Sequence, residues 1–148
     1  MTQGGTHTVR VTLVQEPSVY RELEVDSSKS LYGLAEAIVA AFGFDFDHAF
    51  GFYSKLTGHY HDSDERYELF ADLGEADQGV KGVRRTKVST TFPQVSKTML
   101  LLFDYGDQWQ FKVELIGLGQ KEAKVAYPRV VKQVGTAPPQ YPNLDEDE

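Results

Sequence analysis

The stretch TMLLLFDYGDQWQFKVEL, residues 98–115, joins two strand-like runs through a short polar turn, and it decides how we interpret the fold. The first run is almost entirely apolar, and apolar and polar residues alternate in the second, which is the period of a strand. Gly106 followed by Asp107 is typical of a two-residue type II′ turn, because glycine accepts the positive φ that this turn needs. We therefore predict a β-hairpin here instead of an active site.

The pairing of this hairpin follows from its turn. A two-residue loop at the tip places Leu102 opposite Phe111, and this register collects apolar side chains on one face. It also places Asp104 opposite Trp109, within reach of the indole N–H. Since the first strand is apolar on both faces, we expect it in the interior of its sheet.

The N-terminal third of the chain predicts a second hairpin and one principal helix. Residues 9–25 alternate in polarity on both sides of a turn at Pro17. From Leu31 onward, apolar residues fall three or four apart and share one helical face. Ser30 is the expected N-cap, and Gly43 the residue just after the helix end.

The middle of the chain has weaker patterns. We predict a strand over residues 48–54, a short helix near residues 65–73 that ends at Gly74, and a short strand over residues 83–89. Residues 90–97 are expected to form a turn.

These elements predict a single α+β domain in 148 residues. Its core is expected to be a mixed, mainly antiparallel β-sheet built from hairpins, with one principal helix packed on one face. We expect residues 1–8 to be a flexible N-terminus. Residues 136–148 are expected to form an extended, proline-rich and acidic C-terminal tail.

The composition narrows the classes of protein. A hydrophobic content of 41% supports a real core. The chain has no cysteine, which excludes disulfides, thiolate zinc sites and cysteine nucleophiles. We find no signal-peptide core at the start, and no apolar run approaches the roughly 18 residues of a membrane span. We therefore expect a soluble cytoplasmic protein with no membrane partner.

The charge is −7 overall, which argues against a nucleic-acid partner, but it is unevenly distributed. Seven acids and one base occur in residues 62–77, and five bases with no acid occur in residues 81–97. One interpretation is that the two segments fold near each other and screen each other's charge. The alternative is that residues 81–97 form a basic strip that binds an anionic partner.

Two histidine patterns are candidates for chemistry. On an extended segment, His59 and His61 would project to the same side and Asp62 could add an oxygen ligand, as a first-row metal requires. We interpret this segment as a solvated loop and expect no metal. His48, which follows Asp47, is interpreted as a cap of the helix-to-strand junction.

Short motifs along the chain carry a family resemblance. They are Tyr20-Arg21, Phe42-Gly43-Phe44, Asp47-His48 with Phe52, Phe103 to Trp109, Tyr127-Pro128-Arg129 and Pro138-Pro139. In this order they resemble the plasmid pRiA-type open-reading-frame-three-like family, which is also labelled transposon passenger TnpR-like. The resemblance covers about residues 10–140, and the hairpin motif is its most specific part. The resemblance implies an α+β fold in which a hairpin and a helix pack on a mixed sheet. It implies no settled activity.

The chain departs from the family pattern at polar positions. Phe111 stands where the family usually has histidine, Val130 where it has cysteine, and Gln140-Tyr141 where it has Glu-Asp. If these groups form a chemical site in the family, much of that site is lost here. The recombinase-like label also fails, since we find no nucleophilic serine among clustered arginines and no basic helical module.

We interpret the chain as a small binding or interaction module without catalytic residues, metal or cofactor. Its partner is expected to be a protein or a small molecule, and its oligomeric state stays open. The candidate binding residues are Asp104, Tyr105, Asp107, Trp109, Arg84 and Arg85. Two alternatives remain: a mobile-element-associated nucleic-acid accessory protein that uses residues 81–97, and a metal-assisted enzyme that uses His59, His61 and Asp62.

Overall fold

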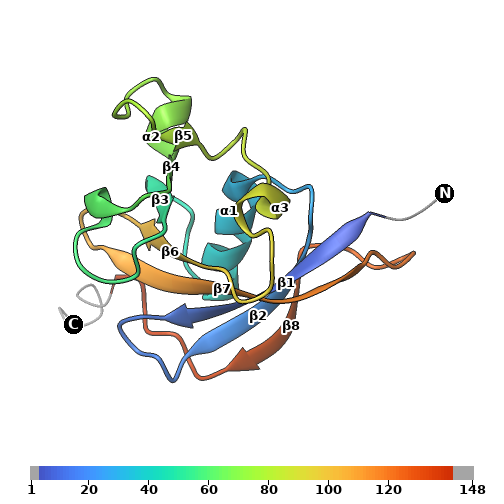
Figure 1. Ribbon diagram of the computed structural model, residues 1–148. Helices are drawn as coiled ribbons and strands as arrows, with labels where there is room; N and C mark the ends of the chain where they lie inside the picture. The colour runs from blue at the N-terminus through green and yellow to red at the C-terminus, as the bar shows by residue number, and fades with distance from the viewer. Residues whose placement is uncertain (1–3, 142–148) are drawn as a thin grey trace.

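The computed structural model describes residues 4–141, which form a mixed eight-stranded β-sheet with a principal helix on one face (Figure 1). The strands lie in the order β5-β4-β3-β6-β7-β1-β2-β8. Neighbours run antiparallel except for β4 and β5. The strands are β1 Gly5–Leu13, β2 Tyr20–Asp26, β3 Phe50–Tyr53, β4 Arg66–Glu68, β5 Lys81–Gly82, β6 Thr98–Phe103, β7 Trp109–Gln120 and β8 Arg129–Val134. The predicted α+β class is confirmed.

The principal helix is α1, Leu31–Ala41, and the predicted boundaries are confirmed. The Ser30 hydroxyl accepts the Gly33 N–H at 3.1 Å, and Gly43 after the helix has a φ of +78°. Gly33 costs helix propensity, but the aliphatic chain of Lys29 crosses it so closely that a Cβ would lie 2.5 Å from the Lys29 Cε. The glycine therefore makes room for Lys29.

The first hairpin forms as predicted, with β1 antiparallel to β2. The expected flexible N-terminus is wrong for residues 5–8, because β1 begins at Gly5. Residues 136–141 have no regular structure, yet Ala137 packs against the core and Gln140 is buried. The remaining parts of the two predicted termini, residues 1–3 and 142–148, lie outside the described residues.

The hydrophobic core lies between α1 and the sheet, and β6 crosses its centre. The position of β6 between β3 and β7 confirms that it is an interior strand. Core side chains from β6 and β7 are Met99, Leu101, Phe103, Phe111, Val113 and Leu115. On the opposite face of the sheet, Leu100 and Leu102 are also buried.

The predicted register of the β6–β7 hairpin is wrong by one residue. Leu101, and not Leu102, lies opposite Phe111, and Phe103 lies opposite Trp109. Because β6 is apolar on both faces, either register buries apolar side chains, so the sequence pattern could not distinguish them.

The predicted two-residue turn is also wrong, because the loop spans residues 104–108. Positive φ occurs at Asp104 (67°) and Gln108 (56°) and not at Gly106. The Asp104 carboxylate accepts the backbone N–H groups of Gly106 and Asp107 at 3.1 and 3.2 Å. This side-chain closure favours the longer loop, and aspartate tolerates the left-handed conformation that it requires.

The segment between β3 and β6 differs most from the prediction. The single helix predicted over residues 65–73 is wrong, because these residues form β4 and then a short helix, α2 (Leu69–Asp72). Gly74 follows the end of α2 as predicted, with a φ of +73°. The strand predicted over residues 83–89 is wrong, because Val88 begins α3, Val88–Thr91. The physical cause is a long-range contact, since the Asp72 carboxylate accepts the N–H groups of residues 83 and 84 and holds them in a loop.

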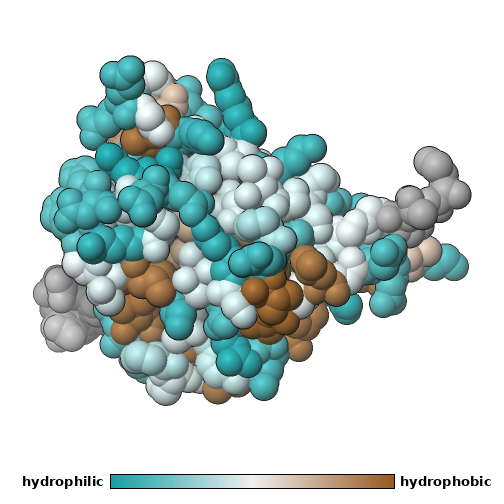
Figure 2. Space-filling view, in the orientation of Figure 1, coloured by the Kyte–Doolittle hydropathy of each residue, from teal (hydrophilic) through white to brown (hydrophobic). Residues whose placement is uncertain are grey.

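A short 3₁₀ helix, η1 (Tyr60–Asp62), lies against the face of the sheet that α1 leaves uncovered. The Tyr60 ring packs on Tyr53 of β3, with 4.7 Å between the ring centroids. In the view of Figure 2, hydrophilic side chains cover the surface over η1. None of the helices within residues 4–141 is long and apolar enough to cross a membrane.

Candidate functional site

The β6–β7 turn sends two neighbouring residues to different places. Asp104 turns toward the loop between α1 and β3, where its N–H donates to the Ala49 carbonyl at 2.9 Å. Tyr105 packs on the opposite side, where its ring lies 5.2 Å from that of Phe70 and 5.8 Å from that of Tyr60. The turn therefore contributes to two separate polar sites.

The first site is a surface cluster around His48. The Nδ1 atom of His48 lies 2.7 Å from Asp47 Oδ1 and 3.6 Å from Asp104 Oδ2. The hydrogen bond to Asp47 raises the pKa of His48, and the carboxylates of Asp104 and Asp107 act in the same direction. Asp104 is buried, whereas the side chains of His48 and Asp47 are about two-fifths exposed.

The C-terminal segment is attached to this cluster. The Tyr141 hydroxyl donates to Asp47 Oδ2 at 2.8 Å, and this bond raises the pKa of Tyr141 to about 12. Gln140 accepts the N–H of Asp45 at 2.7 Å and donates to its carbonyl at 3.2 Å. The predicted role of His48 as a local cap was therefore too limited, since His48 sits where three distant segments meet.

The second site is a cavity of about 340 Å³ on the face of the sheet opposite α1, which we call the Tyr105 pocket. Three tyrosine or phenylalanine rings, one imidazole and four charged side chains line it. The lining residues are Tyr60, His61, Arg66, Glu68, Phe70, Glu75, Ala76, Asp77 and Tyr105.

The floor of the Tyr105 pocket is a buried hydrogen-bond network. The hydroxyl of Tyr53, which is fully buried, donates to Glu68 Oε2 at 2.6 Å and lies 2.7 Å from the Tyr105 hydroxyl. Arg66 Nη2 donates to the same Glu68 oxygen at 3.3 Å. A Cβ on Gly51 would lie 2.7 and 2.8 Å from the two tyrosine hydroxyls, so glycine at this strand position leaves room for them.

Burial determines the chemistry of this floor. It raises the pKa of Tyr53 and of Tyr105 well above the ordinary value, so both phenols stay protonated and can donate hydrogen bonds. Arg66 Nε is buried and has no hydrogen-bond partner among residues 4–141. An unsatisfied buried donor is uncommon and costs stability, which sets this network apart from ordinary sheet packing.

Of the other predicted site residues, Asp107 acts on His48 from the turn, and the remaining three do not join either cluster. Trp109 is half-buried, with its ring 4.8 Å from that of Phe44. The predicted contact of its indole N–H with Asp104 is wrong, because Trp109 Nε1 is buried without a partner among the described residues. Arg84 stacks over the Tyr32 ring at 4.2 Å, and Arg85 is exposed beside a different cavity.

The acidic segment, residues 62–77, and the basic segment, residues 81–97, meet at specific contacts. Lys97 pairs with Glu65, and Asp72 caps the loop that follows β5. Arg84 and Arg85 take part in none of the ion pairs found within residues 4–141. Mutual screening is therefore partial.

The histidine segment forms a 3₁₀ turn and not the extended chain assumed for metal binding. The rings of His59 and His61 stack with centroids 4.8 Å apart, and His59 Nδ1 accepts the backbone N–H of His61 at 3.2 Å. In the described part of the chain, no three His, Cys, Asp or Glu side chains are placed to hold a metal ion.

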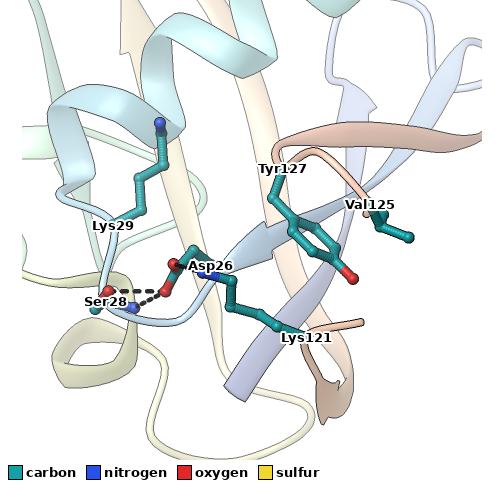
Figure 3. A pocket seen from close by; sticks show the side chains of 6 residues that line it. All are labelled: Asp26, Ser28, Lys29, Lys121, Val125 and Tyr127. Atoms are coloured by element: carbon teal, nitrogen blue, oxygen red, sulfur yellow. Dashed lines mark hydrogen bonds and ion pairs between the residues drawn. The ribbon is translucent and has the colours of Figure 1, made fainter. Parts of the chain in front are cut away.

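Another cavity, of about 290 Å³, lies between the end of β2 and the segment after β7 (Figure 3). Asp26 accepts from Lys121 Nζ at 2.9 Å and from Ser28 at 2.9 and 2.7 Å. These bonds, chiefly that from Lys121, lower the pKa of Asp26 to about 2. Lys29 points away from Asp26 in this view. Asp26 forms its bonds with Ser28 and Lys121, which indicates a structural connection.

Comparison with known proteins identifies the family of this chain. The model of the family described as plasmid pRiA4b ORF-3-like protein matches residues 6–141. The chain belongs to this family. One similar solved structure is the protein of unknown function MM3350 from Methanosarcina mazei Go1, with 19% sequence identity and a TM-score of 0.75. The match covers 94% of this chain and 74% of that one, and it shows a shared fold. No curated protein matches the chain.

The positions that the resemblance singled out, Phe111, Val130, Gln140 and Tyr141, are spread over the fold. Phe111 is fully buried in the core, with its ring 4.9 Å from that of Phe42. Val130 lies on the edge strand β8, and residues 140 and 141 lie in the His48 cluster. Of these positions, only residues 140 and 141 lie together in one polar cluster, where both contact Asp47.

Sequence reasoning found Tyr105 but missed the other members of its network. Tyr53 and Glu68 lie at the ends of β3 and β4, which are strands of only four and three residues, too short to show a clear sequence pattern. A signal was present in Phe-Gly-Phe-Tyr, residues 50–53, because glycine within a strand often marks a close approach. The partner that approaches Gly51 could not be identified without the pairing of β3 with β4 and β6.

Proposed function

We propose that this protein is a binding module that takes a small molecule in the Tyr105 pocket. The observation that carries the proposal is the combination of aromatic walls with an ordered, buried polar floor. Ligand pockets are typically concave and largely apolar, with a few fixed polar groups that orient the ligand. A volume of about 340 Å³ lies near the lower end of the range of roughly 300–1,000 Å³ for such pockets, so it suits a small ligand.

The energetics of the floor support a binding role. Burying the Glu68 carboxylate and leaving Arg66 Nε without a partner both oppose folding. Apolar side chains at these positions would often pack as stably or more stably. Two features of this network oppose folding, and recognition of a ligand explains why they are present.

The test uses NMR titration of the full-length chain with three probes of similar shape: benzylamine, benzyl alcohol and benzoate. We expect at least one probe to shift the amide resonances around Tyr60 and Tyr105 in a saturable manner. The Tyr60→Ala variant, altered in a surface turn, should lose this response. Tyr20→Ala, which changes a tyrosine on another part of the sheet, is the matched control and should retain it.

Two results would contradict the proposal. The first is that none of the three probes shifts resonances of the pocket. The second is that the same shifts persist in Tyr60→Ala while its amide spectrum shows a folded chain, because the probes would then bind elsewhere.

A further inference from the structure

The charges that line the Tyr105 pocket are unbalanced. Three carboxylates, Glu68, Glu75 and Asp77, face the cavity together with one guanidinium, that of Arg66. Arg66 Nη2 already donates to Glu68 at 3.3 Å and to Asp77 at 3.4 Å. The lining therefore retains an excess of negative charge after its internal ion pairs are formed.

The carboxylates occupy two depths. Glu68 is buried in the floor, with only 7% of its side chain exposed, whereas 73% of the Asp77 side chain is exposed. Glu75 is exposed as well. A positively charged ligand group would be attracted at the mouth by Asp77 and Glu75, and deeper in the cavity by Glu68.

The aromatic rings of the pocket add a second attraction for a cation. Tyr60, Phe70 and Tyr105 all line the cavity, and their ring faces carry the negative part of an aromatic quadrupole. Among residues 4–141, the lysine and arginine side chains that stack on rings stack on other rings and not on these three. No cation of the described residues therefore competes with a ligand cation for the three rings that line the cavity.

We infer that the Tyr105 pocket selects a small organic ammonium ion, an inference that rests on the proposed function. An anionic ligand would meet three carboxylates and would compete with Glu68 and Asp77 for Arg66. A neutral ligand would gain contact with the rings but would leave the carboxylates unpaired. An ammonium group joined to a compact apolar body satisfies both the acidic lining and the aromatic walls.

The experiment compares the dissociation constants of benzylamine, benzyl alcohol and benzoate, measured on the full-length chain by the same NMR titration. We expect benzylamine to bind about tenfold more tightly than benzyl alcohol. This factor corresponds to about 1.4 kcal/mol, which lies between the values for an exposed and a desolvated cation–π contact. Benzoate should bind most weakly. Added salt should weaken the binding of benzylamine and leave the binding of benzyl alcohol unchanged.

Two variants separate charge from fold. The double variant Glu75→Gln with Asp77→Asn should weaken the binding of benzylamine several-fold. It should leave the affinity for benzyl alcohol unchanged and strengthen the binding of benzoate. Glu36→Gln, which neutralises an exposed acid on α1, is the matched control and should change none of the three affinities.

The outcomes distinguish this inference from the proposed function. If benzyl alcohol or benzoate binds in the pocket as tightly as benzylamine, the ammonium preference is wrong and the binding module stands. If the double variant lowers all three affinities equally, its acids maintain the pocket structure and the preference is also wrong. If none of the probes binds in the pocket, both proposals fail.

Discussion

Replacing Tyr53 by phenylalanine removes one buried hydroxyl and keeps the ring. In the wild-type chain this hydroxyl is fully buried and donates to a Glu68 carboxylate oxygen at 2.6 Å. The substitution leaves that oxygen with one longer bond, from Arg66 at 3.3 Å. Tyr53→Phe therefore tests whether the network under the pocket holds the face of the sheet together.

The expected magnitude follows from the type of bond. A hydrogen bond to a charged group contributes about 1.5–3 kcal/mol, and a buried acceptor that loses its donor adds a desolvation penalty. We expect Tyr53→Phe to lower the free energy of unfolding by about 2–3 kcal/mol. For a chain of this length that corresponds to a decrease in Tm of roughly 4–12 °C.

The assay is thermal and urea unfolding followed by circular dichroism, with Tyr105→Phe as the matched comparison. The Tyr105 hydroxyl bonds to another hydroxyl at 2.7 Å and its residue is only half-buried, so its loss should lower the free energy of unfolding by about 0.5–1.5 kcal/mol. If Tyr105→Phe is the more destabilising of the two, or if Tyr53→Phe unfolds like wild type, the reasoning is refuted.

Three further predictions concern the charged groups. Asp104→Ala should lower the free energy of unfolding by about 1–3 kcal/mol in urea melts, because two backbone N–H groups of the turn lose their acceptor. In Asp47→Asn, the pKa of His48 should fall toward about 6.5 in an NMR titration, and an unchanged pKa would contradict the assigned cause. The raised pKa of His48 means that this contact stabilises the fold at pH values below about 6.5, and that the stabilisation is lost as the pH rises through the folded-state pKa. Lys121→Met should raise the pKa of Asp26 from about 2 toward 3.8, so the wild-type advantage should be present above pH 3.8 and should disappear as the pH falls toward 2 in acid-unfolding curves.

Local patterns predicted the elements whose stability depends on nearby residues. Ser30 caps α1 and Gly43 follows its end as expected, because both effects act within one helical turn. The first hairpin also formed as predicted. The β6–β7 register failed although its turn is also local. Because β6 is apolar on both faces, the pattern of its side chains could not distinguish a turn closed by Asp104 from a two-residue turn.

The candidate sites could be predicted only in part. Asp104 and Tyr105 were identified from the hairpin motif, but their separation to two sites depends on a loop longer than the predicted one. Glu68 and Tyr53 acquire their roles through pairing of β3 with β4, and such pairing between short strands leaves little trace in sequence. Asp72 likewise reorganises residues 83–84 from a distance that no local pattern records.

The position of Trp109 has a practical consequence for spectroscopy. It is the single tryptophan of the chain, and its ring packs on Phe44, on the α1 side of the sheet, whereas the Tyr105 pocket opens on the other side. Its emission should therefore report the loss of the core on denaturation and should change little when a ligand enters the pocket. Tyrosine absorbance, through Tyr60 and Tyr105, is the intrinsic optical signal suited to following occupancy.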